Sequence, residues 1–222
     1  MARVSSAPDV ASFCMPFVRA LAVDGASISV FGHDGVQATI CSSDAIAARA
    51  EELQFELGEG PHWEALARRH PVLCPNLADE RESDWPVFLE SARGIGIGAL
   101  FAIPMVLGAA LVGIVDLYCL RPHHLDERST SLASALAGRI AASAVDHAMF
   151  AATNHESEET SISPALRREV HQATGMILSQ LEISATDAFS RLQGYAFSSG
   201  RTIEDIAHEV VGRRLAFDNL PD

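Results

Sequence analysis

The C-terminal quarter of this sequence holds the side chains best suited to contact a nucleic acid. Arginine donates hydrogen bonds to phosphate, and an aromatic ring can stack on an unpaired base. Arg191 and Arg201 flank a predicted junction between two helices, and Tyr195 lies between them. Arg201 directly precedes a predicted helix, whose N-terminus favours phosphate, although Glu204 and Asp205 weaken that site and suit a helix cap. The arginines of this segment are Arg167, Arg168, Arg191, Arg201, Arg213 and Arg214. For each arginine taken singly, an ordinary solvated helix face remains the alternative.

A second candidate residue is Asp116, which lies within an apolar run. An uncompensated buried charge is costly, so Asp116 either serves a pocket or lies at the exposed end of its strand. His123 and His124 could supply two ligands of a metal site, but no cysteine or carboxylate lies at the sequence spacing from them that is typical of zinc sites. We therefore expect a solvated loop there, and neither a metal nor a cofactor.

The cysteines do not indicate catalysis. They are scattered along the chain, with no CxxC motif, at Cys14, Cys41, Cys74 and Cys119. This scatter predicts reduced thiols in a cytosolic protein rather than a disulfide framework. The last three lie on or beside predicted strands, where a buried structural cysteine is the usual outcome. No Ser-His-Asp pattern is evident, and the Gly94-x-Gly96-x-Gly98 run lacks the strand–turn–helix setting of a dinucleotide site. The sequence thus favours a protein that is not an enzyme.

The charge of the chain is strongly acidic and unevenly distributed. All 16 basic residues are arginine, and 29 acidic residues give a net charge of −13 at pH 7. Such a balance argues against a general nucleic-acid binder. Residues 1–163 carry 10 Arg and 21 acids, a net charge of −11, whereas residues 164–222 carry 6 Arg and 8 acids, a net charge of −2. An anionic partner therefore meets less repulsion at the C-terminal segment.

One uncharged stretch, residues 94–115, is long enough to span a bilayer. Pro104 and five glycines interrupt it, and its centre predicts two buried strands, 99–107 and 110–118, around a glycine-containing turn. The N-terminal segment MARVSSAPDV lacks the apolar region of a signal peptide. We therefore expect a cytoplasmic protein with no membrane helix.

Residues 8–150 predict an α+β domain, in which helices pack on an antiparallel sheet. Ser43 is the predicted cap of the second helix, and Pro61 suits the first turn of the third. The predicted helices cover residues 8–22, 43–55, 61–68, 85–92 and 125–150, and the predicted strands cover residues 24–31, 36–41, 72–74, 99–107 and 110–118.

The rest of the chain predicts a linker and an all-α bundle. Residues 151–163 are polar and acidic, which indicates a linker or a continuation of the preceding helix. Residues 164–218 show three amphipathic helices, and their predicted caps are Ser163, Ser184 and Thr202. The apolar stripes contain Leu166, Val170, Ala173, Ile177 and Leu181, then Ala188, Phe189, Leu192 and Ala196, then Ile203, Ile206, Ala207, Val210, Val211 and Leu215. Three such helices with short links form a small bundle.

Residues 170–217 resemble the ANTAR domain, the RNA-binding output module of bacterial transcription antiterminators. The resemblance rests on the Gln172–Met176 run, on Ala188 with Leu192, on Ala196, and on Ile206-Ala207 followed by Val210-Val211. It implies that this bundle binds an RNA hairpin in a nascent transcript.

Two departures from the ANTAR pattern weaken the expected phosphate contacts. The usual Ala-Lys-Gly reads Ala173-Thr174-Gly175 here, and a frequent Leu-Arg reads Leu192-Gln193. Thr174 and Gln193 remain able to donate hydrogen bonds to RNA. For duplex nucleic acid, the logarithm of the binding constant falls linearly with the logarithm of the salt concentration. Each lost phosphate contact makes that slope less steep by about 0.9.

Residues 8–150 resemble the GAF domain, a small-molecule sensor. The supporting phrases are LGEGPH at 57–62, WPVF at 85–88, and FAIP at 101–104 with DLY at 116–118. The resemblance implies a ligand pocket lined by Glu59, His62 and Trp63, at the step from loop to helix, together with Asp116. Some GAF domains reduce methionine sulfoxide with cysteines, which keeps that enzyme as an alternative.

The GAF and ANTAR pairing is common in actinobacterial regulators and implies a signal-controlled antiterminator. An unknown small molecule or protein supplies the signal to the GAF-like domain, and we expect a homodimer from the family and from the exposed Ala-rich helix. The alternatives are a protein-interaction regulator whose bundle no longer binds RNA, a DNA-binding helical domain, and a Cys-dependent methionine sulfoxide reductase.

Overall fold

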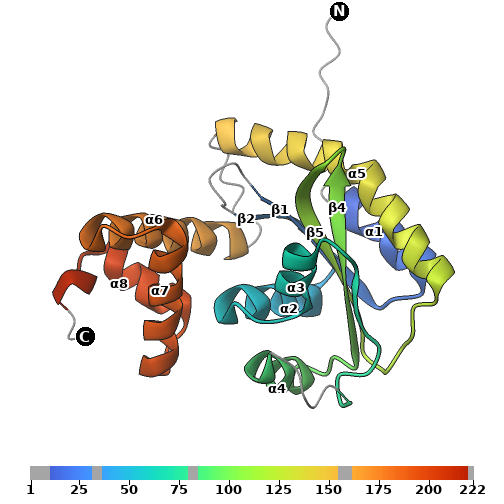
Figure 1. The fold of residues 1–222 in the computed structure, drawn as a ribbon, viewed down its shortest axis with the longest axis horizontal. Helices are drawn as coiled ribbons and strands as arrows, with labels where there is room; N and C mark the ends of the chain where they lie inside the picture. Colours follow the sequence, from blue (N-terminus) through green and yellow to red (C-terminus); the bar gives the residue numbers. More distant parts are fainter. Residues whose placement is uncertain (1–10, 32–36, 80–84, 155–161, 220–222) are drawn as a thin grey trace, which may run out of the picture. The chain divides into compact units, whose positions relative to one another are not determined.

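The chain folds into two compact units, Met1–Glu156 (unit 1) and Ser157–Asp222 (unit 2). The structure is a computed structural model that describes residues 11–31, 37–79, 85–154 and 162–219 (Figure 1). Each unit has its own core and is described by itself.

Unit 1 is built on an antiparallel sheet of five strands in the order β2-β1-β5-β4-β3. The central pairs join β1 to β5 and β5 to β4. The predicted antiparallel α+β domain is therefore confirmed. The strands are β1 (Gly25–Phe31), β2 (Gln37–Ser42), β3 (Val72–Cys74), β4 (Ala99–Leu107) and β5 (Ala110–Cys119).

Helices cover both faces of this sheet (Figure 1). On one face lie α1 (Ala11–Leu21) and α5 (Glu127–Asn154), and on the other lie α2 (Ala45–Leu57), α3 (Pro61–Arg68) and α4 (Pro86–Gly94). Because side chains alternate along a strand, each strand contributes to two buried layers. The core under α1 and α5 is apolar, with Ile28, Phe101 and Leu117 fully buried in it.

The uncharged stretch at residues 94–115 contains β4 and the first part of β5. Gly108 makes the turn between the two strands with φ +64°. A side chain at position 113 would meet the carbonyl oxygen of Ser29, so the close approach of β1 to β5 requires Gly113. The predicted hairpin is confirmed, and no described helix is long and apolar enough to cross a membrane.

The cap of α2 differs from the prediction. Asp44, not Ser43, accepts the backbone N–H groups of Ile46 and Ala47, at 2.9 Å each. The Ser43 hydroxyl instead accepts the N–H of Ala26 and donates to the Asp44 carboxylate. The cap therefore lies one residue later than predicted, because hydrogen bonds from backbone N–H groups to a charged carboxylate are stronger than those to a hydroxyl.

The expectation of four reduced thiols is wrong. Cys14 on α1 and Cys41 on β2 form a disulfide, with their Cα atoms 6.1 Å apart. Cys74 and Cys119 are buried and belong to no disulfide within the described residues. The pair stands 27 residues apart, and only the packing of α1 against β2 brings it together.

Unit 2 contains α6 (Ile162–Leu181), α7 (Ala185–Ser199), α8 (Ile203–Val211) and a 3₁₀ turn, η1 (Phe217–Asn219). The hydroxyls of Ser184 and Thr202 accept the N–H groups of Asp187 and Asp205, as the capping pattern predicts. The buried hydrophobic residues of the three helices belong to the predicted stripes: Val170, Ala173, Ile177, Ala188, Leu192, Ala196, Ile203, Ile206, Ala207 and Val210. The C-terminal helical bundle is therefore confirmed.

The ends of the predicted linker are helical. Residues 151–154 continue α5, and α6 begins at Ile162, so Ser163 lies inside a helix rather than at its cap. Residues 155–161, like the predicted turn at 32–35, lie outside the described part of the chain.

Candidate functional site

A group of polar side chains is buried in unit 1 between the sheet and the helices α2 and α3. We call this group the buried polar cluster. It comprises the buried residues Ser29, Gln37, Glu51, Gln54, His62 and Asp116, together with the half-buried Thr39. The β1–β5 register places Ser27 opposite Asp116, so Ser29, two residues along β1, lies on the same face of the sheet. Such a cluster is unusual because buried polar groups are costly unless they find partners.

His62 and Asp116 form the centre of the buried polar cluster. The Nδ1 of His62 lies 2.6 Å from the Oδ2 of Asp116, and the two side chains are only 1% and 4% exposed. Asp116 is therefore paired with His62, and it is buried rather than at an exposed end of β5. The rings of Phe31 and Trp63 pack edge-on against the imidazole, at centroid distances of 6.0 and 5.4 Å.

The loop between α2 and α3 holds His62 in place. The side-chain oxygen of Gln54 accepts the N–H of His62 at 2.9 Å, and its backbone oxygen accepts the indole N–H of Trp63 at 2.6 Å. Gly60 precedes α3 with φ +118°, and a Cβ there would lie 2.6 Å from the Gln54 side chain. The Gly-Glu-Gly-Pro loop can thus follow this path only with glycine at position 60.

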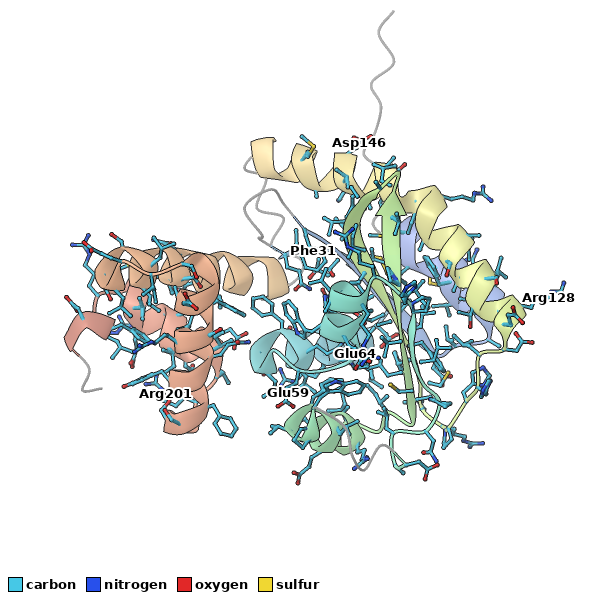
Figure 2. All side chains as sticks on the ribbon, in the orientation of Figure 1. Phe31, Glu59, Glu64, Arg128, Asp146 and Arg201 are labelled. Carbon is cyan, nitrogen blue, oxygen red and sulfur yellow. A yellow bond between two sulfur atoms is a disulfide. The ribbon has the colours of Figure 1, made fainter. Side chains whose placement is uncertain are left out.

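Glu59, predicted to line the pocket, has a structural contact. Its Oε2 accepts the backbone N–H of Phe88 at 3.0 Å, in the first turn of α4 (Figure 2). The residue before α4, Trp85, gives no side-chain cap, so Glu59 supplies the missing acceptor from a distant loop. Of the four predicted pocket residues, His62 and Asp116 pair with each other. Glu59 and Trp63 instead form hydrogen bonds to backbone groups of Phe88 and Gln54.

The sequence analysis missed five members of the buried polar cluster: Ser29, Gln37, Thr39, Glu51 and Gln54. Glu51 accepts hydrogen bonds from Thr39 at 3.0 Å and from the Gln37 side-chain amide at 3.4 Å. Glu51 and Gln54 lie three residues apart on the buried face of α2, beside Ala47 and Ala50. The spacing of these residues could have indicated the cluster from the sequence, because it places two polar residues on the same helix face as small apolar ones.

Five buried polar atoms lack a hydrogen-bond partner within the described ranges of the chain. They are the Ser29 hydroxyl oxygen, Gln37 Oε1, Gln54 Nε2, His62 Nε2 and Asp116 Oδ1. All five belong to the buried polar cluster. Native proteins leave few such atoms unsatisfied, so a concentration of them indicates a site that takes water or a ligand.

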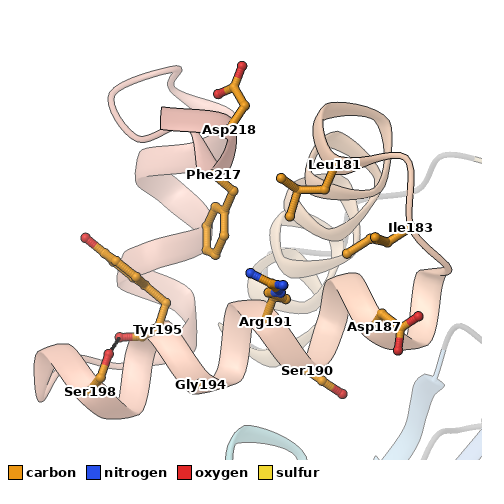
Figure 3. A pocket seen from close by; sticks show the side chains of 10 residues that line it. All are labelled: Leu181, Ile183, Asp187, Ser190, Arg191, Gly194, Tyr195, Ser198, Phe217 and Asp218. Carbon is orange, nitrogen blue, oxygen red and sulfur yellow. Dashed lines mark hydrogen bonds between the residues drawn. The ribbon is translucent and has the colours of Figure 1, made fainter. Parts of the chain in front are cut away.

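Unit 2 carries a groove of about 950 Å³ along one face of α7 (Figure 3). Residues from the end of α6 and from η1 complete it. Its lining consists of Leu181, Ile183, Asp187, Ser190, Arg191, Gly194, Tyr195, Ser198, Phe217 and Asp218. The Tyr195 ring is half-buried and meets the edge of Phe217 at a centroid distance of 5.4 Å. The groove thus combines an exposed arginine with an aromatic wall.

The other arginines of unit 2 differ in their availability. Arg201 is exposed, but it forms an ion pair with Glu209 at 3.0 Å, which raises the pKa of the guanidinium and lowers that of the carboxyl. Arg213 and Arg214 are exposed in the turn after α8. The side chains of Arg167 and Arg168 lie outside the description.

Thr174 offers little to a partner. The Thr174 hydroxyl is buried, at 9% exposure, and donates to the carbonyl of Val170 at 2.8 Å, so it is already used within α6. Gln193 is half-buried on α7. The structure therefore brings Arg191 and Tyr195 together in one groove, and it leaves Thr174 outside that groove.

No group of three or more His, Cys, Asp or Glu side chains in the described ranges is arranged to hold a metal ion. The ring of His123 packs against the edge of Phe101, at a centroid distance of 6.4 Å.

Comparison with known structures gives the fold of unit 1. The GAF domain region of a Geobacter sulfurreducens PCA protein is 22% identical, covers 60% of this chain and 87% of that chain, and has a TM-score of 0.50. The GAF domain of a phosphoenolpyruvate-protein phosphotransferase from Coxiella burnetii is 19% identical, covers 67% and 90%, and also has a TM-score of 0.50. A type II free methionine-R-sulfoxide reductase from Thermoplasma acidophilum is 12% identical, covers 63% and 97%, and has a TM-score of 0.43, too low to bear on activity.

Family comparison covers both units. Residues 6–143 match the GAF domain family, and residues 163–211 match the ANTAR domain family. None of the curated proteins matches the chain. The first match alone covers more than half of the chain, and it agrees with the sheet and helices of unit 1. The chain therefore belongs to the GAF domain family and carries an ANTAR domain after its GAF domain.

Proposed function

We propose that this protein is a signal-responsive transcription antitermination regulator, in which the GAF domain controls RNA binding by the ANTAR domain. The GAF domain receives a small-molecule or protein signal, and the ANTAR domain holds a hairpin in the nascent transcript. The presence of both domains in one chain supports this role. Such an architecture belongs to a regulator rather than to an enzyme.

The observation that carries the RNA proposal is the groove of unit 2. Arg191 is exposed there, beside the ring of Tyr195 (Figure 3). A guanidinium binds phosphate, and an aromatic wall accepts an unpaired base from a hairpin loop. Asp187 and Asp218 at the same groove repel phosphate, so we propose that the loop enters with a base over Tyr195 and its phosphate at Arg191.

Selection from a transcript pool tests this function directly. The full chain is mixed with RNA at low salt, and the bound fraction is sequenced. We expect enrichment of a hairpin with an unpaired loop, and loss of that enrichment with Arg191→Glu. The matched control is Arg121→Glu, which changes an exposed arginine of unit 1 by the same charge. If no hairpin is enriched, the chain fits the alternative of a protein-interaction regulator.

The cysteines do not favour the rival function of a sulfoxide reductase. Cys14 and Cys41 are joined in a disulfide, and Cys74 and Cys119 are buried. Burial raises the pKa of the Cys119 thiol, so the reactive thiolate is scarce at neutral pH. Absence of turnover of free methionine sulfoxide by the purified protein removes this candidate.

We further propose that the chain acts in the cytoplasm as a homodimer. Two ANTAR domains in one dimer raise the affinity for RNA through effective concentration. The exposed face of the Ala-rich helix α5, which includes Leu132 at 41% exposure, is the proposed contact. Sedimentation of the purified chain tests the dimer.

A further inference from the structure

We propose that helix α5 pairs antiparallel with the α5 of a second copy of this chain, with Arg139 of each copy beside Asp146 of the other. The proposal rests on the homodimer of the proposed function and gives that dimer a direction and a register. It follows from the exposed face of α5, whose order of apolar, small and charged residues is complementary to its own reverse.

The two faces of α5 differ in burial. Ala133, Ala137, Ala141 and Ala144 are fully buried in the core between α5 and the sheet. On the opposite side, six exposed residues follow one another at alternating intervals of three and four, which is the spacing of a seam between two paired helices. We call these residues the α5 seam: Leu132, Ala135, Arg139, Ala142, Asp146 and Met149.

The α5 seam begins and ends with a large apolar side chain. Leu132 is 41% exposed, and Met149 is 62% exposed. In an antiparallel pair, Leu132 of each copy lies opposite the partner's Met149, so both ends of the seam lose apolar surface to water. Removal of such surface from water favours association.

The charged residues of the α5 seam fit the same register. Arg139 lies opposite the partner's Ala142, and Asp146 lies opposite the partner's Ala135, so each long or charged side chain faces a small one. Arg139 and the partner's Asp146 are then four residues apart along the axis, about 6 Å, which a guanidinium can span. The two-fold axis of such a dimer forms this ion pair twice.

A parallel pair lacks this complementarity. There Arg139 faces the partner's Arg139, and Asp146 faces the partner's Asp146, so like charges meet twice. Within the described part of the chain, Arg139 and Asp146 form no hydrogen bond or ion pair, and Asp146 lies on α5 well away from unit 1's other labelled acids (Figure 2). Both side chains are therefore available to a second copy.

Cross-linking of the full chain tests the direction of the pair. Leu132→Cys and Met149→Cys are prepared as separate proteins, mixed to equilibrium and treated with a short thiol-specific cross-linker. We expect a cross-linked dimer from the mixture and none from either variant alone. The wild-type chain is the control, because Cys74 and Cys119 are buried and should not react.

Charge reversal tests the register. Arg139→Glu should raise the dimer dissociation constant, measured by sedimentation, by at least about tenfold, because it sets a carboxylate beside the partner's Asp146. Asp146→Arg should do the same, and the double variant Arg139→Glu with Asp146→Arg should restore the wild-type value. Arg121→Glu, at an exposed position outside α5, is the matched control and should dimerise like the wild type. Since all these side chains are exposed, the melting temperatures should stay close to that of the wild type.

The inference is overturned if Leu132→Cys cross-links to itself, or if the double variant dimerises no better than Arg139→Glu. The proposed homodimer survives either result. A chain that stays monomeric at all concentrations contradicts both the homodimer and this inference. RNA binding is measured on the same proteins, and an antiparallel dimer that binds no RNA contradicts only the proposed antitermination role.

Discussion

At the scale of single residues, the structure separates side chains that are available to a partner from those that hold the fold. Glu59 and Asp116 are both acidic and were both predicted to line a pocket. Glu59 is satisfied by the backbone of α4, whereas Asp116 keeps one oxygen unpartnered within the described chain. The difference decides which residue a ligand can use.

Tyr118 gives a prediction about pH. Its hydroxyl donates to Asp44 at 2.9 Å, and burial, followed by this hydrogen bond, raises the pKa of the phenol well above its usual value near 10. A raised pKa in the folded state contributes stability that is fully present below about pH 10 and is lost as the pH rises toward the folded value. Phenolate absorbance should therefore show that Tyr118, one of the two tyrosines of the chain, ionises only well above pH 10.

Tyr118→Phe removes this hydrogen bond. We expect unit 1 to lose about 1.5–3 kcal/mol at neutral pH, because the acceptor is charged, and to lose less additional stability above pH 10 than the wild type. Urea unfolding at the two pH values measures both effects. Equal alkaline sensitivity of Tyr118→Phe and the wild-type chain would show that another group controls the transition.

Glu59 gives a second prediction. Glu59→Ala should destabilise unit 1 by about 1 kcal/mol, as loss of a helix cap does. Glu64→Ala is the matched control, because Glu64 lies on α3 in an i,i+4 pair with exposed Arg68, and such a pair contributes about 0.5 kcal/mol or less. Urea unfolding distinguishes the two, and equal effects would contradict the capping role.

At the scale of elements, local patterns in the sequence predicted most of the helices and strands. They did not predict which residues of different elements are in contact. Ser184 and Thr202 were identifiable as caps because the groups they bond lie three residues away. His62 and Asp116 are 54 residues apart, and Glu59 and Phe88 are 29 apart. Nothing in the spacing of such pairs indicates that the sheet and its helices bring them together.

The disulfide between α1 and β2 gives a prediction at this scale. It closes a segment with a sequence separation of 27, for which loop-closure entropy predicts a contribution of about 3–4 kcal/mol. Cys14→Ser with Cys41→Ser should lower the melting temperature of unit 1 and abolish its dependence on reductant. Cys74→Ser is the control, since Cys74 is a buried cysteine outside the disulfide. If reductant leaves the wild-type melting temperature unchanged, the bond does not form in solution.

At the scale of the whole molecule, the chain consists of two domains with separate cores. Unit 1 contains the buried polar cluster with its five unpartnered atoms, and unit 2 contains the groove lined by Arg191 and Tyr195. The acidic charge is concentrated in residues 1–163, at −11, against −2 for the remainder. An anionic partner therefore meets less repulsion at residues 164–222 than at the rest of the chain.

The most direct test of the account is the salt dependence of RNA binding by the full chain. The hairpin enriched by selection is titrated with the wild type, Arg191→Ala and the control Arg121→Ala over a range of salt concentrations. Arg191→Ala should weaken binding about tenfold or more and reduce the logarithmic salt slope by about 0.7–0.9, the loss of one phosphate contact. Equal affinities and equal slopes for all three proteins would contradict the claim that unit 2 binds RNA through this groove.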